Sequence, residues 1–224
     1  MTLQNFLEEI YNKYYLKFFS SYYKELKKAV GDSKSLLDVG CGKNSPIQFF
    51  SEGIYSVGVD AHKPSIKRSK QKNIHNEYYN IDVLDIEKKF LPGSYDCVIA
   101  LDLVEHLEKE DGLRLLQMME RIAKEKVIVF TPNGFLSQSE HDNNPWQIHK
   151  SGWEVKEMRN KGYKVVGING WKPLRGECAI PKLWPKFFWI IVSDITQLFV
   201  RNKPEKAFQI LCVKIISKKT KSRR

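Results

Sequence analysis

The sequence has few cysteines, and none of them is paired along the chain. The four cysteines lie at positions 41, 97, 178 and 212, and no Cys-x-x-Cys spacing occurs. The pattern therefore predicts neither a disulfide framework nor a metal or redox site built from cysteine pairs. Because Cys41, Cys97 and Cys212 fall in or beside apolar, strand-like stretches, we expect them to be reduced thiols in or near the core.

Long apolar runs are also missing, and none reaches the length of a membrane span. Glu8 and Glu9 interrupt the N-terminal stretch, so we expect no signal peptide. The 224 residues, of which 42% are hydrophobic and 28% charged, are sufficient for one well-packed globular domain.

Acidic residues are in deficit, with 26 Asp and Glu against 37 Lys and Arg, which gives a net charge of +11. Part of the excess lies in residues 218–224, which we expect to form a solvated tail. Attraction of this basic tail to anionic lipid or to nucleic acid stays open as an alternative.

The stretch from Leu36 to Pro46 predicts a buried strand, a tight glycine turn and a helix start. Gly40 and Gly42 allow backbone angles closed to other residues and let a ligand approach the main chain. Asp60 ends the next apolar strand, twenty residues after Gly40, which is the usual distance to a carboxylate that binds a ribose diol. These features predict a nucleoside-containing cofactor at the carboxyl ends of parallel strands.

A third glycine, which the dinucleotide-binding fingerprint requires, is absent because Ser45 stands in its place. Asp38, within the first strand and two residues before Gly40, is a second departure from that fingerprint. A nicotinamide-dependent oxidoreductase is therefore disfavoured, and a carboxylate at position 38 is within reach of the amino group of a methionine-like moiety.

Four segments in register carry a resemblance to a known family. The glycine turn resembles motif I of the class I, Rossmann-like S-adenosylmethionine (SAM)-dependent methyltransferases, of the type 11/12-like kind. Further matches are the third-strand stretch 80–85, the fourth-strand stretch 93–101 and its sequel Leu103-Val104-Glu105-His106-Leu107. The match covers roughly residues 30–135 in the order and spacing of the family.

The resemblance implies SAM as the cofactor, S-adenosylhomocysteine as the product and a set of binding residues. Asp38 and the amides of Gly40 and Gly42 would hold the methionine part, and Asp60 the ribose diol. Asp82 and the backbone of Val83 would bind the adenine, although Asp82 could instead cap a loop and Asp85 competes for the role. The full set of expected cofactor-binding residues is Asp38, Gly40, Cys41, Gly42, Asp60, Ala61, Asp82, Val83 and Leu101.

Alternating strand and helix patterns predict an α/β fold. We expect a doubly wound, seven-stranded, mostly parallel sheet with an antiparallel last strand. The predicted strands cover residues 35–39, 54–60, 77–81, 95–101, 126–131, 163–169 and 208–216, and the main helices 3–29, 46–52, 65–72, 109–124, 153–160 and 187–200.

The domain expected from these elements spans residues 1–217. Its N-terminal helix 3–29 would pack on the core or serve as a lid over the cofactor. An insertion at 170–206 precedes the last strand, and its apolar segment 187–200 would be buried against the sheet or a dimer partner, or lie on a membrane interface.

Histidines gather at the predicted carboxyl edge of the sheet, where an acceptor would bind. His141 and His149 lie on the long polar loop 132–150, and His106 follows the fourth strand. We expect one of these three to act as the catalytic base for a hydroxyl acceptor, with His141 preferred because acidic residues flank it. Asp102 lies three positions before Glu105-His106, and this arrangement is similar to a divalent-metal site in some quinone O-methyltransferases. We expect local packing of these residues and no metal.

The function expected from the sequence is methyl transfer to a small-molecule, sugar or lipid-linked acceptor, with oxygen as the favoured acceptor atom. Five tryptophans, at positions 146, 153, 171, 184 and 189, are expected to shape the acceptor site. Alternatives are an RNA or protein methyltransferase, or a SAM-binding regulator without turnover. We expect a cytoplasmic protein without a nucleic-acid partner, with peripheral contact at the inner membrane face through 182–203 and the basic tail as an open alternative.

Overall fold

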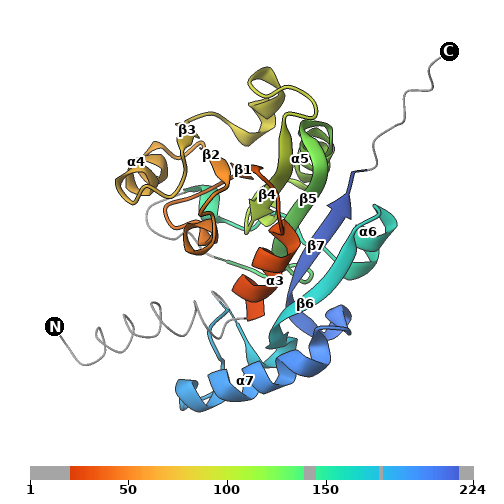
Figure 1. Ribbon diagram of the computed structural model, residues 1–224. Coiled ribbons are helices and arrows are strands. Elements are labelled where there is room, and N and C mark those ends of the chain that lie inside the picture. The colour runs from red at the N-terminus through yellow and green to blue at the C-terminus, as the bar shows by residue number, and fades with distance from the viewer. Residues whose placement is uncertain (1–20, 139–144, 177–178, 217–224) are drawn as a thin grey trace.

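The computed structural model describes residues 21–138, 145–176 and 179–216, and these residues form one seven-stranded sheet with helices on both faces (Figure 1). The strand order is β3-β2-β1-β4-β5-β7-β6. In chain order the strands are β1 (Ser35–Val39), β2 (Tyr55–Val59), β3 (Glu77–Tyr79), β4 (Tyr95–Leu101), β5 (Ala123–Pro132), β6 (Lys164–Trp171) and β7 (Ala207–Ile215).

The predicted strand directions are confirmed. β1 pairs in parallel with β2 and β4, and β4 pairs in parallel with β5. β7 runs antiparallel to both of its neighbours, β5 and β6, and lies between them. Parallel strands joined by crossover helices place the carboxyl ends of β1, β2, β4 and β5 along one edge of the sheet.

The helices follow the expected pattern, with shifts at their ends. They are α3 (Ser21–Val30), α4 (Lys63–Gln71), α5 (Lys109–Ile122), α6 (Val155–Asn160) and α7 (Lys186–Val200). The helix predicted at 46–52 is a short 3-10 helix, Pro46–Phe49, and the connection after β3 contains another, Val83–Lys88. Residues 3–20 of the predicted N-terminal helix lie outside the described residues.

Two hydrophobic cores lie on the two faces of the sheet because successive side chains of a strand point to opposite sides. Leu37 and Val98 belong to the core with α5, whereas Leu36 and Cys97 belong to the core with α3. Cys41, Cys97 and Cys212 are buried free thiols, as expected, and desolvation raises the pKa of Cys97 to about 12.

Among the described residues, no helix is both long enough and apolar enough to cross a membrane. The insertion before β7 forms α7, which lies along β6 at the edge of the sheet (Figure 1).

Candidate active site

A cavity of about 800 Å³ opens at the carboxyl ends of the parallel strands. All nine residues that the sequence predicts for the cofactor line this cavity, which brings together segments from residue 38 to residue 101. The predicted site residues are therefore neighbours in space, at the edge of the sheet where ligands bind in open α/β folds.

The turn after β1 has the geometry that two glycines permit. Gly40 has φ +70° and Gly42 has φ +58°, both in the left-handed region. A Cβ atom at Gly40 would also stand 2.6 Å from Leu103 Cδ1, well inside contact distance. Any other residue at position 40 would therefore be strained by its backbone and would push the segment after β4 away.

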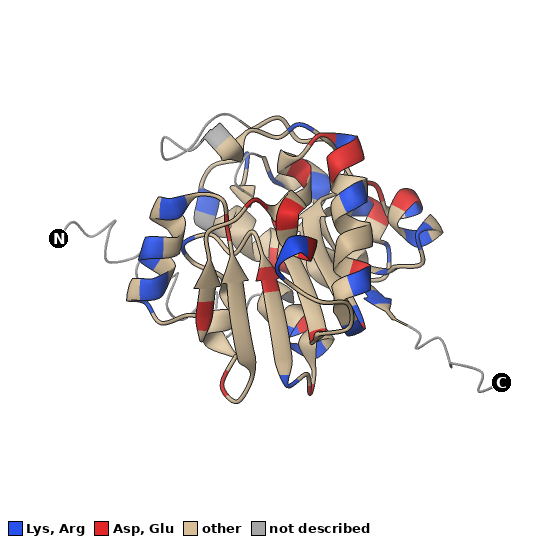
Figure 2. Cartoon of the chain, turned by 90° about the horizontal axis from the view of Figure 1, so that it is seen from above, with Lys and Arg blue, Asp and Glu red and all other residues tan. Residues whose placement is uncertain are grey.

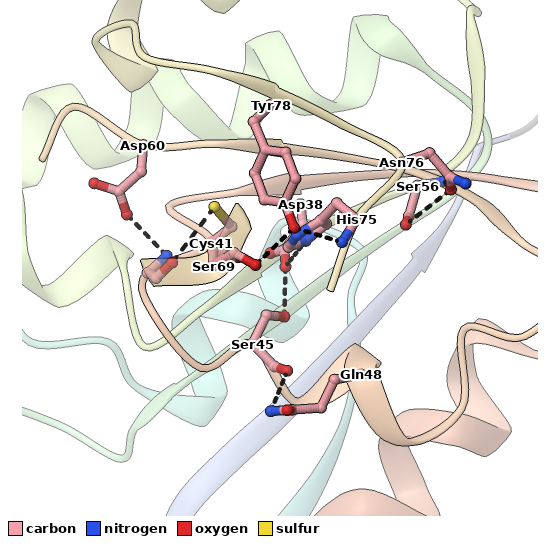
Figure 3. Close-up of polar contacts among 11 residues, drawn as sticks. Asp38, Cys41, Ser45, Gln48, Ser56, Asp60, Ser69, His75, Asn76 and Tyr78 are labelled. Atoms are coloured by element: carbon pink, nitrogen blue, oxygen red, sulfur yellow. Dashed lines mark hydrogen bonds and ion pairs between the residues drawn. The ribbon is translucent and has the colours of Figure 1, made fainter. Parts of the chain in front are cut away.

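The amides of this turn donate hydrogen bonds within the chain. The Gly40 amide donates to the Val59 carbonyl oxygen over 2.8 Å, and the Gly42 amide donates to Asp60 Oδ2 over 2.8 Å (Figure 3). The reason is that the turn must be tied to the neighbouring strand β2 to hold its shape.

Asp60 organises the end of β2 as well as facing the cavity. Its Oδ1 accepts a hydrogen bond of 2.7 Å from the His62 amide, while Oδ2 accepts from Gly42. Burial raises the pKa of Asp60 above its usual value, against the lowering effect of these two amides. Two backbone donors thus fix the orientation of this carboxylate.

Asp38 is buried and bonded to two partners from other segments. Its Oδ2 accepts from Ser45 Oγ over 2.5 Å and from His75 Nε2 over 3.0 Å (Figure 3). His75 was not anticipated from the sequence, since no motif singles out the loop between α4 and β3. Within the described residues, His75 Nδ1 and Ser69 Oγ are buried without a hydrogen-bond partner.

Asp82 caps the 3-10 helix Val83–Lys88, because its side chain accepts from the Leu84 amide over 2.9 Å. It lines the cavity all the same, whereas Asp85 is absent from the lining and pairs with Lys88. The loop-capping interpretation is therefore confirmed for Asp82, and of the two aspartates only Asp82 is among the described lining residues of the cavity.

An acid–histidine cluster, consisting of Asp102, Glu105, His106 and His149, forms the other end of the same cavity. Glu105, His106 and His149 are buried, and each offers a ligand atom within 4.8 Å of the others. The imidazole rings of His106 and His149 lie 4.7 Å apart, in an edge-on arrangement. His141, the histidine preferred from the sequence, lies outside the described residues.

Hydrogen bonds set the orientation of the cluster. Glu105 Oε2 accepts from Thr131 Oγ1 over 2.9 Å, at the end of β5. His106 Nδ1 donates to the Ile148 carbonyl over 3.3 Å, and His149 Nδ1 donates to the Leu136 carbonyl over 2.6 Å. Because a carbonyl can only accept, Nδ1 carries the proton in both rings and a neutral ring has its lone pair on Nε2.

Electrostatic effects favour the neutral forms of three members of the cluster, Asp102, Glu105 and His106. Asp102 is exposed toward the cavity, but the surrounding protein desolvates its carboxyl group and raises its pKa to about 7. Burial and the nearby Asp102 carboxylate raise the pKa of Glu105 well above its usual value. Burial and the neighbouring His149 lower the pKa of His106 to about 4, so this imidazole is neutral at physiological pH.

The loop after β5 brings His149 back over the sheet. The amides of Lys150 and Ser151 donate to the Glu105 carbonyl over 2.8 and 3.1 Å, which fastens the end of the loop to the segment after β4. Sequence alone places His106 and His149 at one edge, but their approach depends on this fastening between residues more than forty positions apart.

Aromatic side chains complete the walls of the cavity. Tyr22 and Tyr23 of α3 line it, and Tyr22 stacks on Phe130 with ring centroids 4.1 Å apart. Of the five tryptophans expected around the acceptor, Trp146 alone is among the lining residues described. Trp153 is fully buried in the core. Trp171, at the end of β6, and Trp184, just before α7, are exposed.

The sequence is similar to those of known methyltransferases. Residues 37–131 match the family described as "Methyltransferase domain". A small RNA 2′-O-methyltransferase of Tetrahymena thermophila is 25% identical over 182 residues, which cover 66% of this chain and 43% of that protein. The chain thus spans less than half the length of that relative.

Solved structures share the fold. A SAM-dependent methyltransferase from Archaeoglobus fulgidus superposes with a TM-score of 0.60 and 17% identity, covering 96% of this chain and all of the other. The plantazolicin methyltransferase BpumL in complex with S-adenosylhomocysteine has a TM-score of 0.52 and 17% identity, covering 96% of this chain and 90% of the other.

Proposed function

We propose that this chain is a class I SAM-dependent methyltransferase that methylates a hydroxyl oxygen of its acceptor. The match of residues 37–131 to the methyltransferase-domain family and the shared fold support the proposal. The observation that carries this proposal is the shared cavity, which joins the SAM-binding residues to the acid–histidine cluster. Transfer from a sulfonium needs donor and acceptor held in line at near contact. A hydroxyl acceptor must also lose its proton, and the cluster offers groups suited to this task.

The cofactor roles follow from the positions of the lining residues. Asp38 would bind the amino group of SAM, Asp60 the ribose diol, and Asp82 with the Val83 backbone the adenine. Gly40, Cys41, Gly42, Ala61 and Leu101 would form the apolar and backbone walls of this half. Tyr22 and Tyr23 support a role for α3 in covering the cofactor, as part of the proposed lid.

The acid–histidine cluster also fits a divalent cation, which revises the expectation that no metal is used. Glu105, His106 and His149 present one carboxylate and two imidazoles that converge within 4.8 Å, a donor set suited to transition-metal ions. Carbonyl oxygens orient both rings, as outer partners commonly do at metal sites. A cation there would supply Lewis acidity that lowers the pKa of the acceptor hydroxyl.

The acceptor is most simply a sugar, a small molecule or a lipid-linked group. Among the described lining residues, five acidic side chains (Asp38, Asp60, Asp82, Asp102 and Glu105) outnumber two basic ones (Lys43 and Arg68), although burial favours the neutral forms of Asp102 and Glu105. The carboxylates of Asp38, Asp60 and Asp82 would attract the cationic cofactor and disfavour a phosphate-rich strand. We therefore place an uncharged hydroxyl compound ahead of RNA.

A ribose hydroxyl of RNA is the second candidate. It is favoured by the similarity to a protein named as a small RNA 2′-O-methyltransferase, and a ribose 2′-hydroxyl would suit the same chemistry. A protein acceptor and a SAM-binding role without turnover have no comparable observation in their favour.

The test is release of S-adenosylhomocysteine with a panel of acceptors. Neutral glycans, a lipid-linked sugar and an RNA oligonucleotide with a free or 2′-deoxy terminal ribose would be compared at fixed SAM. Turnover with a hydroxyl compound supports the proposal, and turnover confined to the free-ribose RNA selects the second candidate. Methylation at nitrogen or carbon alone, or no turnover while SAM binds, would contradict O-methyl transfer.

The role of the cluster is tested separately with Glu105→Gln and His149→Ala. We expect both to lose Mn²⁺ binding measured by calorimetry, to lower turnover by about 100-fold, and to keep the SAM affinity of the wild-type protein. Lys150→Ala, next to the cluster but outside the cavity lining, is the matched control. Full activity after chelation, with no Mn²⁺ binding, would exclude the cation and leave a histidine base as the proposal.

A further inference from the structure

The helix α7 is attached to the edge of the sheet through its polar side chains. Gln197 and Ser193 are buried, although such residues usually lie on the outer face of a surface helix. Gln197 Oε1 accepts from the Gly170 amide over 2.9 Å, and Gln197 Nε2 donates to the Gly167 carbonyl over 2.8 Å. Thr196 Oγ1 accepts from the Trp171 amide over 2.9 Å.

These hydrogen bonds give partners to backbone groups on the outer edge of β6. β6 is an edge strand, and its pairing with β7 shifts register between Ile168 and Trp171, so some of its backbone groups need partners from elsewhere. Glycines let the helix come close. A Cβ atom at Gly170 would stand 2.3 Å from Ser193 Oγ, and one at Gly167 would stand 2.3 Å from the Val200 carbonyl oxygen.

The rotation of α7 about its own axis is fixed by these contacts, and its apolar residues consequently face outward. Leu198 is 77% exposed and Phe199 is 70% exposed. The outward stripe of large apolar side chains, which we call the α7 stripe, consists of Phe188, Ile191, Ile195, Leu198 and Phe199, and it continues into the exposed Leu183 and Trp184.

Basic residues flank the α7 stripe. Lys182, Lys186 and Lys203 are exposed near its two ends. Asp194 is the one acidic residue between positions 179 and 204, and it pairs with Arg175 at 3.5 Å. An apolar stripe with aromatic residues and flanking lysines is the pattern of helices that lie in the interface of an anionic membrane.

We propose that the α7 stripe docks on an anionic membrane surface, with α7 lying parallel to the bilayer. A second copy of the chain is a poorer occupant. A helix of 15 residues is about 22 Å long and about 10 Å wide, so one face of α7 offers on the order of 200–300 Å², against about 800 Å² per partner in a stable protein interface. The flanking lysines would also face one another in a symmetric dimer, whereas anionic lipid attracts them.

The membrane contact has a consequence for the acceptor, and this consequence alone rests on the proposed function. Ala179 lines the active-site cavity, and the next residue, Ile180, is exposed and leads into the α7 segment. The chain therefore runs from a wall of the cavity directly into the segment that would contact the bilayer. A lipid-linked acceptor is therefore the substrate class that the arrangement favours.

The experiment measures binding of the full chain to vesicles by flotation. Vesicles of phosphatidylcholine with phosphatidylglycerol would be compared with phosphatidylcholine alone, for the wild-type protein, Leu198→Glu and Ile195→Glu. Leu91→Glu is the matched control, because Leu91 is 75% exposed in the turn before β4 and belongs to another part of the surface. Calorimetry with SAM on each variant reports whether the cofactor half is intact.

We expect the wild-type protein to bind anionic vesicles, less so at high salt. Leu198→Glu and Ile195→Glu should each weaken binding by about tenfold or more, and Leu91→Glu should bind as the wild type does. The proposal is overturned if the wild type ignores vesicles, or if deletion of 218–224 removes all binding while Leu198→Glu removes none. It is equally overturned if the wild type sediments as a dimer that Leu198→Glu dissociates, since a second copy would then cover the stripe. These outcomes do not depend on methyl transfer.

Discussion

At the scale of single residues, hydrogen bonds within the chain fix the side chains of the proposed cofactor site. Asp60 is gripped by the amides of Gly42 and His62, and Asp38 by Ser45 and His75. Carboxylates fixed in this way lose little freedom when a ligand arrives, which favours binding. Motif spacing identified Asp38 and Asp60, but their partners could not be predicted, because His75 approaches Asp38 through the packing of α4 and β3.

Asp60→Asn should weaken SAM binding by about tenfold or more, because the ribose diol would lose a charged acceptor. The change keeps the size of the side chain and an oxygen for one of the two amides. Calorimetric titration with SAM measures the effect, with NAD as the ligand that should not bind the wild-type protein. Unaltered SAM affinity in a variant of normal thermal stability would remove Asp60 from the ribose role.

His75→Phe should also lower SAM affinity, by roughly five- to tenfold, because Asp38 would lose one of its two donors and its orientation. His75→Gln, whose amide can still donate, should restore part of the loss. The same titration gives the answer, and a thermal melt separates misplacement of Asp38 from loss of folding. Equal affinities for the Phe and Gln variants would mean that His75 acts by packing alone.

At the scale of elements, the order and direction of the strands were predictable, and the ends and partners of several segments were not. Apolar stretches such as 35–39 and 95–101 are long enough to identify buried parallel strands. α7 shows the limit of such patterns, since the apolar periodicity of 187–200 predicts a helix but cannot say which face turns inward. That choice depends on the hydrogen bonds that the β6 edge requires, which the sequence of α7 does not reveal.

Asp96, at the start of β4, holds the start of β1 through hydrogen bonds. Asp96 Oδ2 accepts from the amides of Lys34 and Ser35 over 2.9 and 3.1 Å, and Oδ1 pairs with Lys124 at 3.0 Å. Asp96→Ala should cost roughly 1–3 kcal/mol in the free energy of unfolding at pH 7, because two amides lose their acceptor. Asp96→Asn should cost less than about 1 kcal/mol, because the amide oxygen can still accept.

The effect of Asp96 should depend on pH. Burial acts to raise the pKa of Asp96, but the hydrogen bonds from Lys124, Lys34 and Ser35 outweigh it, so the pKa in the folded protein lies below 3.8. The charge therefore contributes stability above pH 4, and this contribution is lost as the pH falls through the folded-state pKa. Urea unfolding of wild type and Asp96→Asn at pH 7 and pH 3 should show a difference that shrinks at the lower pH. A constant difference would assign the effect to packing.

At the scale of the whole molecule, charge is distributed unevenly between the surface and the site. The chain carries a net charge of +11. Several helices in Figure 2 carry both basic and acidic residues, whereas α4, on the side of the N-terminus, carries basic residues alone. The cavity differs from this surface, because its described lining has five acidic side chains against two basic ones, and burial favours the neutral forms of Asp102 and Glu105 among the five. The net positive charge of the whole chain therefore does not predict the excess of acidic side chains in the lining of the cavity.

Binding of the product should stabilise the entire fold, because the cavity joins segments from α3 to β7. S-adenosylhomocysteine at 100 times its dissociation constant should add about 2.7 kcal/mol to the free energy of unfolding, which corresponds to a rise in Tm of roughly 5–10 °C for a chain of this size. Differential scanning fluorimetry measures the shift, and adenosine alone should give a smaller one. No shift with S-adenosylhomocysteine would contradict a preformed cofactor site.

The position of β7 between β5 and β6 has a consequence for the synthesis of the protein. β6 emerges from the ribosome before residues 172–206 and β7 do, so it has no strand to pair with for a few seconds at about 5–20 residues per second. During that interval the growing chain presents the open edge of β5 and the apolar α7 segment together. Chaperone demand should therefore concentrate in this late stage of translation, and pausing between β6 and β7 should promote aggregation of the nascent chain.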